Sequence, residues 1–228
     1  MLSSKYSNVL TLLLVVLIVA ILGIVGYFTY DLLNSKSVNA NAQTTMDEFQ
    51  RAITRETIKD DSQNVTTDNS DKDPLAELSE YESNKTQTTE KEVEKVYMEG
   101  YEVKGTIKIP KTGIEYPVLD SVTKRSLEIA VGIAYGPGIN EVGNTIIYGH
   151  NYRNGLFFSD NKKLSNGDKI LLTDQTGKTI TYVIYNIYQT DPSDASYFTR
   201  DTNGKREISL QTCTDDSSAR IIIWAAEE

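Results

Sequence analysis

Residues 207–226 read EISLQTCTDDSSARIIIWAA, which is two runs rich in β-forming residues separated by six polar or small residues. Runs of this length and composition favour strands, and a short polar connection favours a tight reversal between them. An antiparallel pair would place Cys213, the last residue of the first run, beside Arg220, the first residue of the second. The segment therefore predicts a β-hairpin that carries a thiol and a guanidinium at the same end.

The same kind of short run recurs through residues 98–228, with turn residues between the runs. Two stretches, 124–131 and 156–163, can form short helices. About 130 residues with seven or eight strands are enough for a compact all-β domain, and we expect a closed or nearly closed barrel. The candidate strands are residues 105–109, 113–119, 144–150, 169–173, 179–190, 207–213 and 220–226.

An apolar segment precedes this domain. Residues 9–30, VLTLLLVVLIVAILGIVGYFTY, contain no charged side chain and as a helix could cross the roughly 30 Å hydrocarbon layer of a membrane. Lys5 lies before the segment and Asp31 directly after it, which predicts residues 1–8 in the cytoplasm and the rest of the chain outside the cell. The alternative is a cleaved signal peptide, because residues 40–42, ANA, have the small-x-small form of a cleavage site.

Residues 31–97 have the composition of an acidic stalk. They hold 15 acidic and 8 basic residues, so most of the net charge of −9 lies there. We expect this stalk to be flexible, with short helices possible at 46–58 and 74–81. An acidic chain without a basic cluster has no electrostatic footprint for nucleic acid, which excludes that class of partner.

The chain has one cysteine, Cys213, and one histidine, His150, and each ends a candidate strand. One thiol can form no internal disulfide, and a thiolate beside an imidazolium or guanidinium is a nucleophile. Simpler interpretations stay open for each residue. Cys213 can be a small buried apolar residue, His150 an ordinary loop residue, and Arg220 a partner of Asp215 or Asp216. Spacing alone does not bring His150 to Cys213, 63 positions further on.

Two segments resemble the sortases, membrane-anchored cysteine transpeptidases of Gram-positive bacteria. They are NTIIYGHNYRNGLFFSDNKKL, residues 144–164, and SLQTCTDDSSARIIIWAA, residues 209–226, in which Leu210, Thr212, Cys213 and Arg220 match the family's Leu-x-Thr-Cys and arginine signature. The resemblance extends over residues 105–226. It implies an eight-stranded β-barrel of sortase type with short helices, preceded by the transmembrane anchor and the stalk, with the barrel in residues 98–228.

The resemblance also implies a reaction. Cys213 would be the nucleophile, His150 the general acid and Arg220 the group that stabilises the substrate carbonyl or oxyanion. The substrates would be surface proteins with a sorting motif, transferred through a thioacyl intermediate to an amine of a peptidoglycan precursor or of a pilin. Two other functions remain open, a hydrolytic cysteine peptidase and a non-catalytic cell-surface binding module. The histidine segment is most similar to class B sortases, but residues 191–206 are too short for that class's usual insertion.

Thr212, Asn151, Asp191 and Tyr197 would border the substrate groove by the same resemblance, although each can equally be an ordinary turn or surface residue. We expect no cofactor. Residues 201–205, DTNGK, look faintly like a calcium loop but lack the full pattern of an EF-hand. One histidine and one cysteine are also too few for a zinc site, so we expect no required metal.

Overall fold

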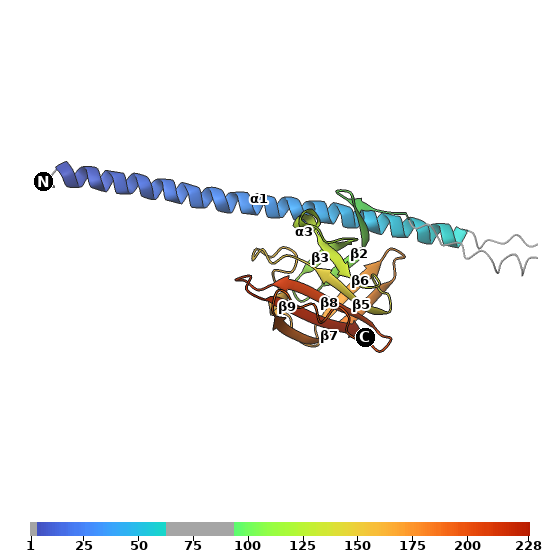
Figure 1. Cartoon of the computed structure of the whole chain (residues 1–228). Helices are drawn as coiled ribbons and strands as arrows, with labels where there is room; N and C mark the ends of the chain where they lie inside the picture. Colours follow the sequence, from blue (N-terminus) through green and yellow to red (C-terminus); the bar gives the residue numbers. More distant parts are fainter. Residues whose placement is uncertain (1–3, 63–93) are drawn as a thin grey trace, which may run out of the picture. The chain divides into compact units, whose positions relative to one another are not determined.

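The computed structural model describes residues 4–62 and 94–228 (Figure 1). Its helical elements are α1 (Ser4–Ser62), α3 (Lys124–Ile129) and the 3-10 turn η1 (Asn161–Lys163). Its strands are β1 (Tyr97–Met98), β2 (Tyr101–Ile109), β3 (Ile114–Leu119), β4 (Val131–Tyr135), β5 (Gly143–Tyr148), β6 (Lys169–Asp174), β7 (Thr179–Thr190), β8 (Arg206–Cys213) and β9 (Arg220–Glu227).

Eight of these strands form a closed barrel. They pair in the order β2, β3, β4, β5, β8, β9, β7 and β6, and a further pairing between β2 and β6 closes the ring. The β3–β4 and β5–β8 pairs are parallel and the other barrel pairs are antiparallel. Closure leaves no unpaired edge in the ring. The all-β barrel expected from the sequence is therefore confirmed.

The barrel interior is filled by apolar side chains that alternate with outward-facing residues along each strand. Along β8 the burial pattern is strictly alternating near the carboxyl end, where Leu210 and Thr212 are buried while Gln211 and Cys213 are partly exposed. Fully buried members of the core include Val103, Ile107, Ile147, Leu172, Leu210 and Ile223.

Some expected boundaries differ from the observed ones. The helix expected at 124–131 ends at Ile129, because Ala130 is already extended, and Val131 opens the strand β4, which the sequence did not predict. The helix expected at 156–163 was wrong in length, since only the turn η1 forms. Phe157 has a φ of 50°, in the left-handed region, which a right-handed helix does not accommodate.

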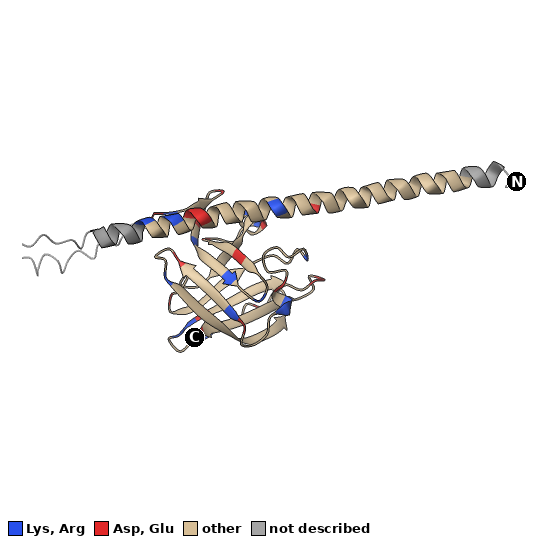
Figure 2. Ribbon diagram, turned by 180° about the vertical axis from the view of Figure 1, so that it is seen from behind, with Lys and Arg blue, Asp and Glu red and all other residues tan. Residues whose placement is uncertain are grey.

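The helix α1 contains the apolar segment and continues beyond it. By length and composition it could cross a membrane, with a mean hydropathy of 3.2 over its apolar part. Figure 2 shows the uncharged part of α1 before its first charged residues. Residues 31–62 of the expected stalk are helical, and the possible helix at 74–81 lies outside the described residues. Within the compact unit 44–228, Met46, Phe49 and Ile53 are buried.

Candidate active site

The parallel pairing of β5 with β8 brings the chain's histidine to the level of its cysteine. Tyr148 lies opposite Gln211 at the end of the paired region. His150 and Cys213 each follow two residues later, and the Gly149 N–H still donates to the Gln211 carbonyl oxygen, so the two residues lie next to the end of the same paired region. The register thus joins two residues that are 63 positions apart in the sequence.

The pairing of β9 with its two neighbours adds Arg220 to this level. Arg220 lies opposite Cys213 on β8 and opposite Thr190, the last residue of β7. Cys213, Arg220 and Thr190 are neighbours across three strands, and His150 lies just beyond the end of β5. We call these four residues the catalytic row, because three of them are the candidate catalytic residues. The carboxyl ends of β5, β7 and β8 therefore meet at one end of the barrel.

The three candidate catalytic residues lie on the outer face of the barrel. His150, Cys213 and Arg220 are all partly exposed, whereas their neighbour Thr212 is 2% exposed and faces the interior. A thiol sealed in the core would be inert, and this arrangement removes that interpretation of Cys213. All three side chains are within reach of a substrate from solvent.

Close packing at Gly149 holds the segment that carries His150. The Gly149 N–H donates to the carbonyl oxygen of Gln211 at 3.2 Å, which continues the parallel ladder. A Cβ at position 149 would lie 2.6 Å from a ring carbon of Phe158 and 2.9 Å from a methyl group of Val131. Only glycine fits between the strand and this ring, so packing requires a glycine at the position before His150.

The electrostatic surroundings of His150 favour its neutral form. Burial lowers the pKa of His150 below its ordinary value, and the negative charge of Glu128 offsets part of that effect. The ring of Tyr152 packs beside the imidazole, with 4.8 Å between ring centroids. A neutral imidazole can accept the proton of a thiol and later return it to a leaving group.

The guanidinium of Arg220 has no carboxylate partner among the described residues. Its hydrogen bond is to the carbonyl oxygen of Ala219, at 3.3 Å. Hydrogen bonds from Ser193 and, to a smaller extent, the charge of Arg220 lower the pKa of Asp191, but Asp191 and Arg220 form no ion pair. The two carboxylates of the hairpin turn are engaged elsewhere. Asp215 accepts from Lys162 at 2.7 Å, and Asp216 accepts from Thr214 and Ser218 in its own turn. The Arg220 side chain therefore keeps its donors available for another oxygen atom.

The four residues predicted to bind substrate have different positions. Thr212 points into the barrel, and its hydroxyl has no partner among the described residues. Asp191 begins the loop after β7, where it accepts from the backbone and hydroxyl of Ser193. Tyr197 belongs to the same loop and is buried, at 2% exposed. Asn151 lies beside the catalytic row and donates to the carbonyl oxygen of Cys213 at 2.9 Å.

A buried ion pair that the sequence did not indicate fastens the loop after β7 to the outer face. Arg200 pairs with Glu207 of β8, and both side chains are almost wholly buried, at 12% and 10% exposed. Arg200 also donates to the side-chain oxygen of Asn144 at 3.0 Å and lies 4.7 Å from the ring centre of Trp224. Burial and a bond to Glu207 raise the pKa of Tyr185 to about 12. No sequence pattern marks this cluster, because its members, Tyr185 included, lie on five separate segments.

The fastened loop forms one side of an aromatic hollow on the face that carries the catalytic row. Its volume is about 590 Å³, and Tyr135, Asn144 and Phe198 are among the residues that line it. Phe198 packs against both Tyr135 and Tyr148, at centroid separations of 5.5 and 6.4 Å. Asn144 lies opposite Glu207, so the hollow lies on the outer face towards the amino end of β5, and the contact of Phe198 with Tyr148 connects its lining with the segment that leads to His150.

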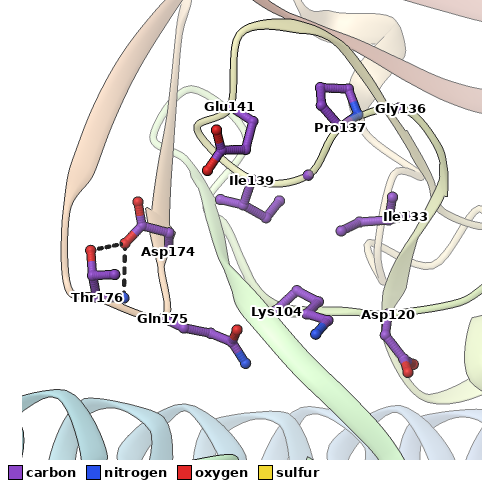
Figure 3. A pocket seen from close by; sticks show the side chains of 11 residues that line it. Lys104, Asp120, Ile133, Gly136, Pro137, Ile139, Glu141, Asp174, Gln175 and Thr176 are labelled. Carbon is purple, nitrogen blue, oxygen red and sulfur yellow. Dashed lines mark hydrogen bonds between the residues drawn. The ribbon is translucent and has the colours of Figure 1, made fainter. Parts of the chain in front are cut away.

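A second hollow shares Gly136 and Pro137 with the first and extends to the turn where β6 leads into β7. It has a volume of about 400 Å³ and is lined by Lys104, Asp120, Glu141 and Asp174 among others (Figure 3). The Asp174 carboxylate accepts hydrogen bonds there from the backbone N–H and the hydroxyl of Thr176. Within residues 4–62 and 94–228, no three His, Cys, Asp or Glu side chains are grouped to hold a metal ion.

Comparison with known proteins agrees with this geometry. A family model described as "Sortase domain" matches residues 107–228, which is more than half of the chain and includes every residue of the catalytic row. The chain belongs to the sortase family. The expected family is thereby confirmed, and the catalytic row occupies the matched region of this sortase.

Two relatives similar to this chain are both named sortase A. The chain is 31% identical over 135 residues to sortase A of Bacillus anthracis, covering 58% of this chain and 63% of that protein. It is 29% identical to sortase A of Streptococcus agalactiae, over 52% of that protein's length. The chain thus spans between half and two thirds of these relatives.

Solved structures show the same barrel. A sortase A lid mutant from Corynebacterium diphtheriae matches with a TM-score of 0.52 and 25% identity, over 65% of this chain and 78% of that one. A sortase D5 from Clostridium perfringens matches over 83% of this chain and 99% of that one, with a TM-score of 0.56 and 22% identity. The resemblance of the histidine segment to class B stays a prediction.

Proposed function

We propose that this sortase is a membrane-anchored cysteine transpeptidase that cleaves a sorting motif of surface proteins and transfers them to an amine of the cell wall or of a pilin. The single observation that carries the proposal is the catalytic row. The register of three neighbouring strands lines up His150, Cys213 and Arg220 on one partly exposed face, and Arg220 has no carboxylate partner in the described part of the chain.

The proposed first half-reaction forms a thioester. The sulfur of Cys213 attacks the carbonyl carbon of the residue before the scissile bond, and its proton passes to the neutral imidazole of His150. Arg220 donates to the oxygen atom on which negative charge develops. When the carbon–nitrogen bond breaks, His150 returns the proton to the departing amine.

The proposed second half-reaction reverses these roles. An incoming amine attacks the thioester carbon and gives a proton to His150, the carbon–sulfur bond breaks, and Cys213 leaves with a proton from the imidazole. A new amide joins the surface protein to its acceptor. The chemistry requires no cofactor, because every proton is exchanged between the thiol, the imidazole and the two amines.

A panel of labelled peptides tests the proposal, with Leu-Pro-x-Thr-Gly and Asn-Pro-x-Thr sequences incubated with the full chain in detergent. Mass spectrometry should detect an acyl adduct on Cys213 with at least one peptide and none in Cys213→Ala. An added amine such as oligoglycine should increase product formation. A rate that no added amine changes would support a hydrolytic peptidase instead.

The absence of any adduct, together with an inert Cys213 towards a thiol-reactive sulfone, would favour a non-catalytic binding module. The peptide that reacts also identifies the sorting motif. The amine that resolves the adduct identifies the class of acceptor, either a peptidoglycan stem or a pilin lysine.

A further inference from the structure

Asn151 makes a set of hydrogen bonds that connects the histidine segment with the loop that carries Cys213. Its side-chain nitrogen donates to the carbonyl oxygen of Cys213 at 2.9 Å and to a carboxylate oxygen of Asp215 at 3.0 Å. Its side-chain oxygen accepts from the N–H of Arg153 at 3.1 Å. Both hydrogens of the amide nitrogen are therefore used inside the protein, so neither is free for a substrate.

The bond to Cys213 occupies a special place in the sheet. The parallel ladder between β5 and β8 continues through the Gly149 N–H, which donates to the carbonyl oxygen of Gln211. Beyond Gly149 the chain turns into a short reversal, closed by the bond from the Phe158 N–H to the His150 carbonyl oxygen and by a bridge between Asn151 and Phe157. The next hydrogen bond between the two segments lies two residues after Gln211. There the Cys213 carbonyl oxygen accepts from the Asn151 side chain and not from a backbone N–H.

A side chain thus continues the contact between the two segments where the backbone of β5 has left the sheet. We propose that Asn151 is a positioning residue, whose amide holds the backbone of Cys213 at a fixed separation from the adjacent His150. The inference rests on the proposed function, which assigns the proton exchange to these two side chains. A small displacement of either group is costly, because a misplacement of 1 Å can reduce a rate by about 100-fold.

The remaining bonds of this cluster extend the connection to a third segment. Asp215 accepts from Asn151 and from Lys162 of η1, and these two bonds hold the pKa of the Asp215 carboxyl below its ordinary value. The side chains of Lys162 and Asp215 are 42% and 51% exposed, and exposed pairs contribute little to stability. We therefore expect the bond to the Cys213 carbonyl to have the larger effect on the catalytic row.

The variants Asn151→Asp and Asn151→Ala separate the donor from the acceptor of this amide. Asn151→Asp keeps an oxygen for the Arg153 N–H but replaces the donor with an oxygen that faces the Cys213 carbonyl and Asp215. Asn151→Ala removes both functions. If only the local turn matters, Asn151→Asp should behave like the parent protein. If the donor matters, both variants should lose activity, and Lys162→Ala should lose little.

Two measurements are needed, one with substrate and one without. For peptide acylation, kcat should fall roughly 10- to 100-fold in Asn151→Asp and Asn151→Ala while KM changes little. The second measurement uses the fact that the chain has one histidine and one cysteine. Alkylation of Cys213 with iodoacetamide should change the chemical shift of the single histidine signal in the proton NMR spectrum of the parent. In both variants this change in chemical shift should be about half as large or smaller.

Parent-like kcat together with a parent-like NMR response in Asn151→Asp would overturn the proposal. A parent protein that acylates no peptide would contradict the proposed transpeptidase, while the NMR comparison would still test Asn151. Circular dichroism and a melting curve establish that each variant is folded. If Asn151→Asp does not fold, Asn151→Ser replaces it in both measurements. The serine side chain is too short to reach both the Cys213 carbonyl oxygen and Asp215, so the donor function is again lost.

Discussion

The surroundings of Arg220 favour a functional role over a structural one. It lies opposite Cys213, and no carboxylate of the described residues pairs with it. A guanidinium has several donors in a rigid plane, whereas an ammonium is a compact point charge. The shape of the side chain, and not only its charge, is therefore expected to matter for the oxyanion.

Replacing Arg220 with lysine tests this point, because the charge is kept and the planar donor group is lost. We expect kcat/KM for peptide acylation to fall by about 100-fold, the order of magnitude found when one oxyanion donor is removed. Arg206→Lys is a matched control, since Arg206 pairs with Glu227 at the other end of the barrel. A parent-like rate in Arg220→Lys would contradict the proposed role.

His150 predicts a specific dependence of stability on pH. Its pKa is lowered by burial in the folded protein, so between that value and the ordinary histidine pKa the unfolded chain binds more protons. The free energy of unfolding should therefore decrease as the pH falls through this window. Above the ordinary pKa the contribution of His150 is fully present.

Urea unfolding of the parent and of His150→Gln at a series of pH values measures this contribution. The carboxylates titrate alike in both proteins, so the difference between the two unfolding free energies isolates the histidine. A difference that stays constant on acidification through the window would show that burial does not depress this pKa.

At the scale of elements, the loop after β7 depends on a buried ion pair for its position. Arg200 and Glu207 are both almost fully buried, and Arg200 also contacts Asn144 and Trp224. Removing one member of such a pair leaves a charge without a counterpart in a poorly solvated place. The loop should then detach from β8, and the aromatic hollow that Phe198 and Arg200 line should lose one wall.

Glu207→Gln tests this dependence at almost constant side-chain volume. We expect unfolding in denaturant to show a loss of about 3 kcal/mol, together with a higher KM for peptide. Glu115→Gln provides the control, because the Glu115–Lys108 pair is 44% and 54% exposed and should contribute less than about 1 kcal/mol. Equal losses in the two variants would mean that burial of the first pair has no effect.

The elements also show where local patterns predict structure and where they do not. The strands β6 to β9 are close to their expected ranges because alternating β-branched runs and turn residues are local signals. The strand β4 was missed because it follows α3 with one residue between them, and its Val-Gly-Ile run continued the apolar pattern of the helix. The helix expected at 156–163 failed because buried Phe157 and Phe158 determine the local backbone.

At the scale of the whole molecule, labelling of the single thiol can measure the membrane topology of the chain. The expected orientation places residues 1–8 in the cytoplasm and Cys213 outside the cell. A membrane-impermeant maleimide should therefore label Cys213 in intact cells. The double variant Ser4→Cys with Cys213→Ala is the matched control, and it should react only after the cells are permeabilised. The opposite labelling pattern would reverse the proposed orientation.

The sequence by itself determined what depends on neighbouring residues. These features are the apolar segment long enough to span a membrane, the strand-rich domain, and the hairpin that sets Cys213 opposite Arg220. The resemblance of two segments to sortases predicted that His150 acts with the thiol, a connection that no local pattern could make, and this role stays a prediction.

Only the tertiary structure decided how distant segments combine. Barrel closure and the parallel β5–β8 register bring His150 to Cys213, and folding assembles the Arg200–Glu207 pair and the Asn151 bridge. The physical reason is that these contacts join side chains from segments far apart in the chain. Their partners exist only after the strands have paired and the barrel has closed.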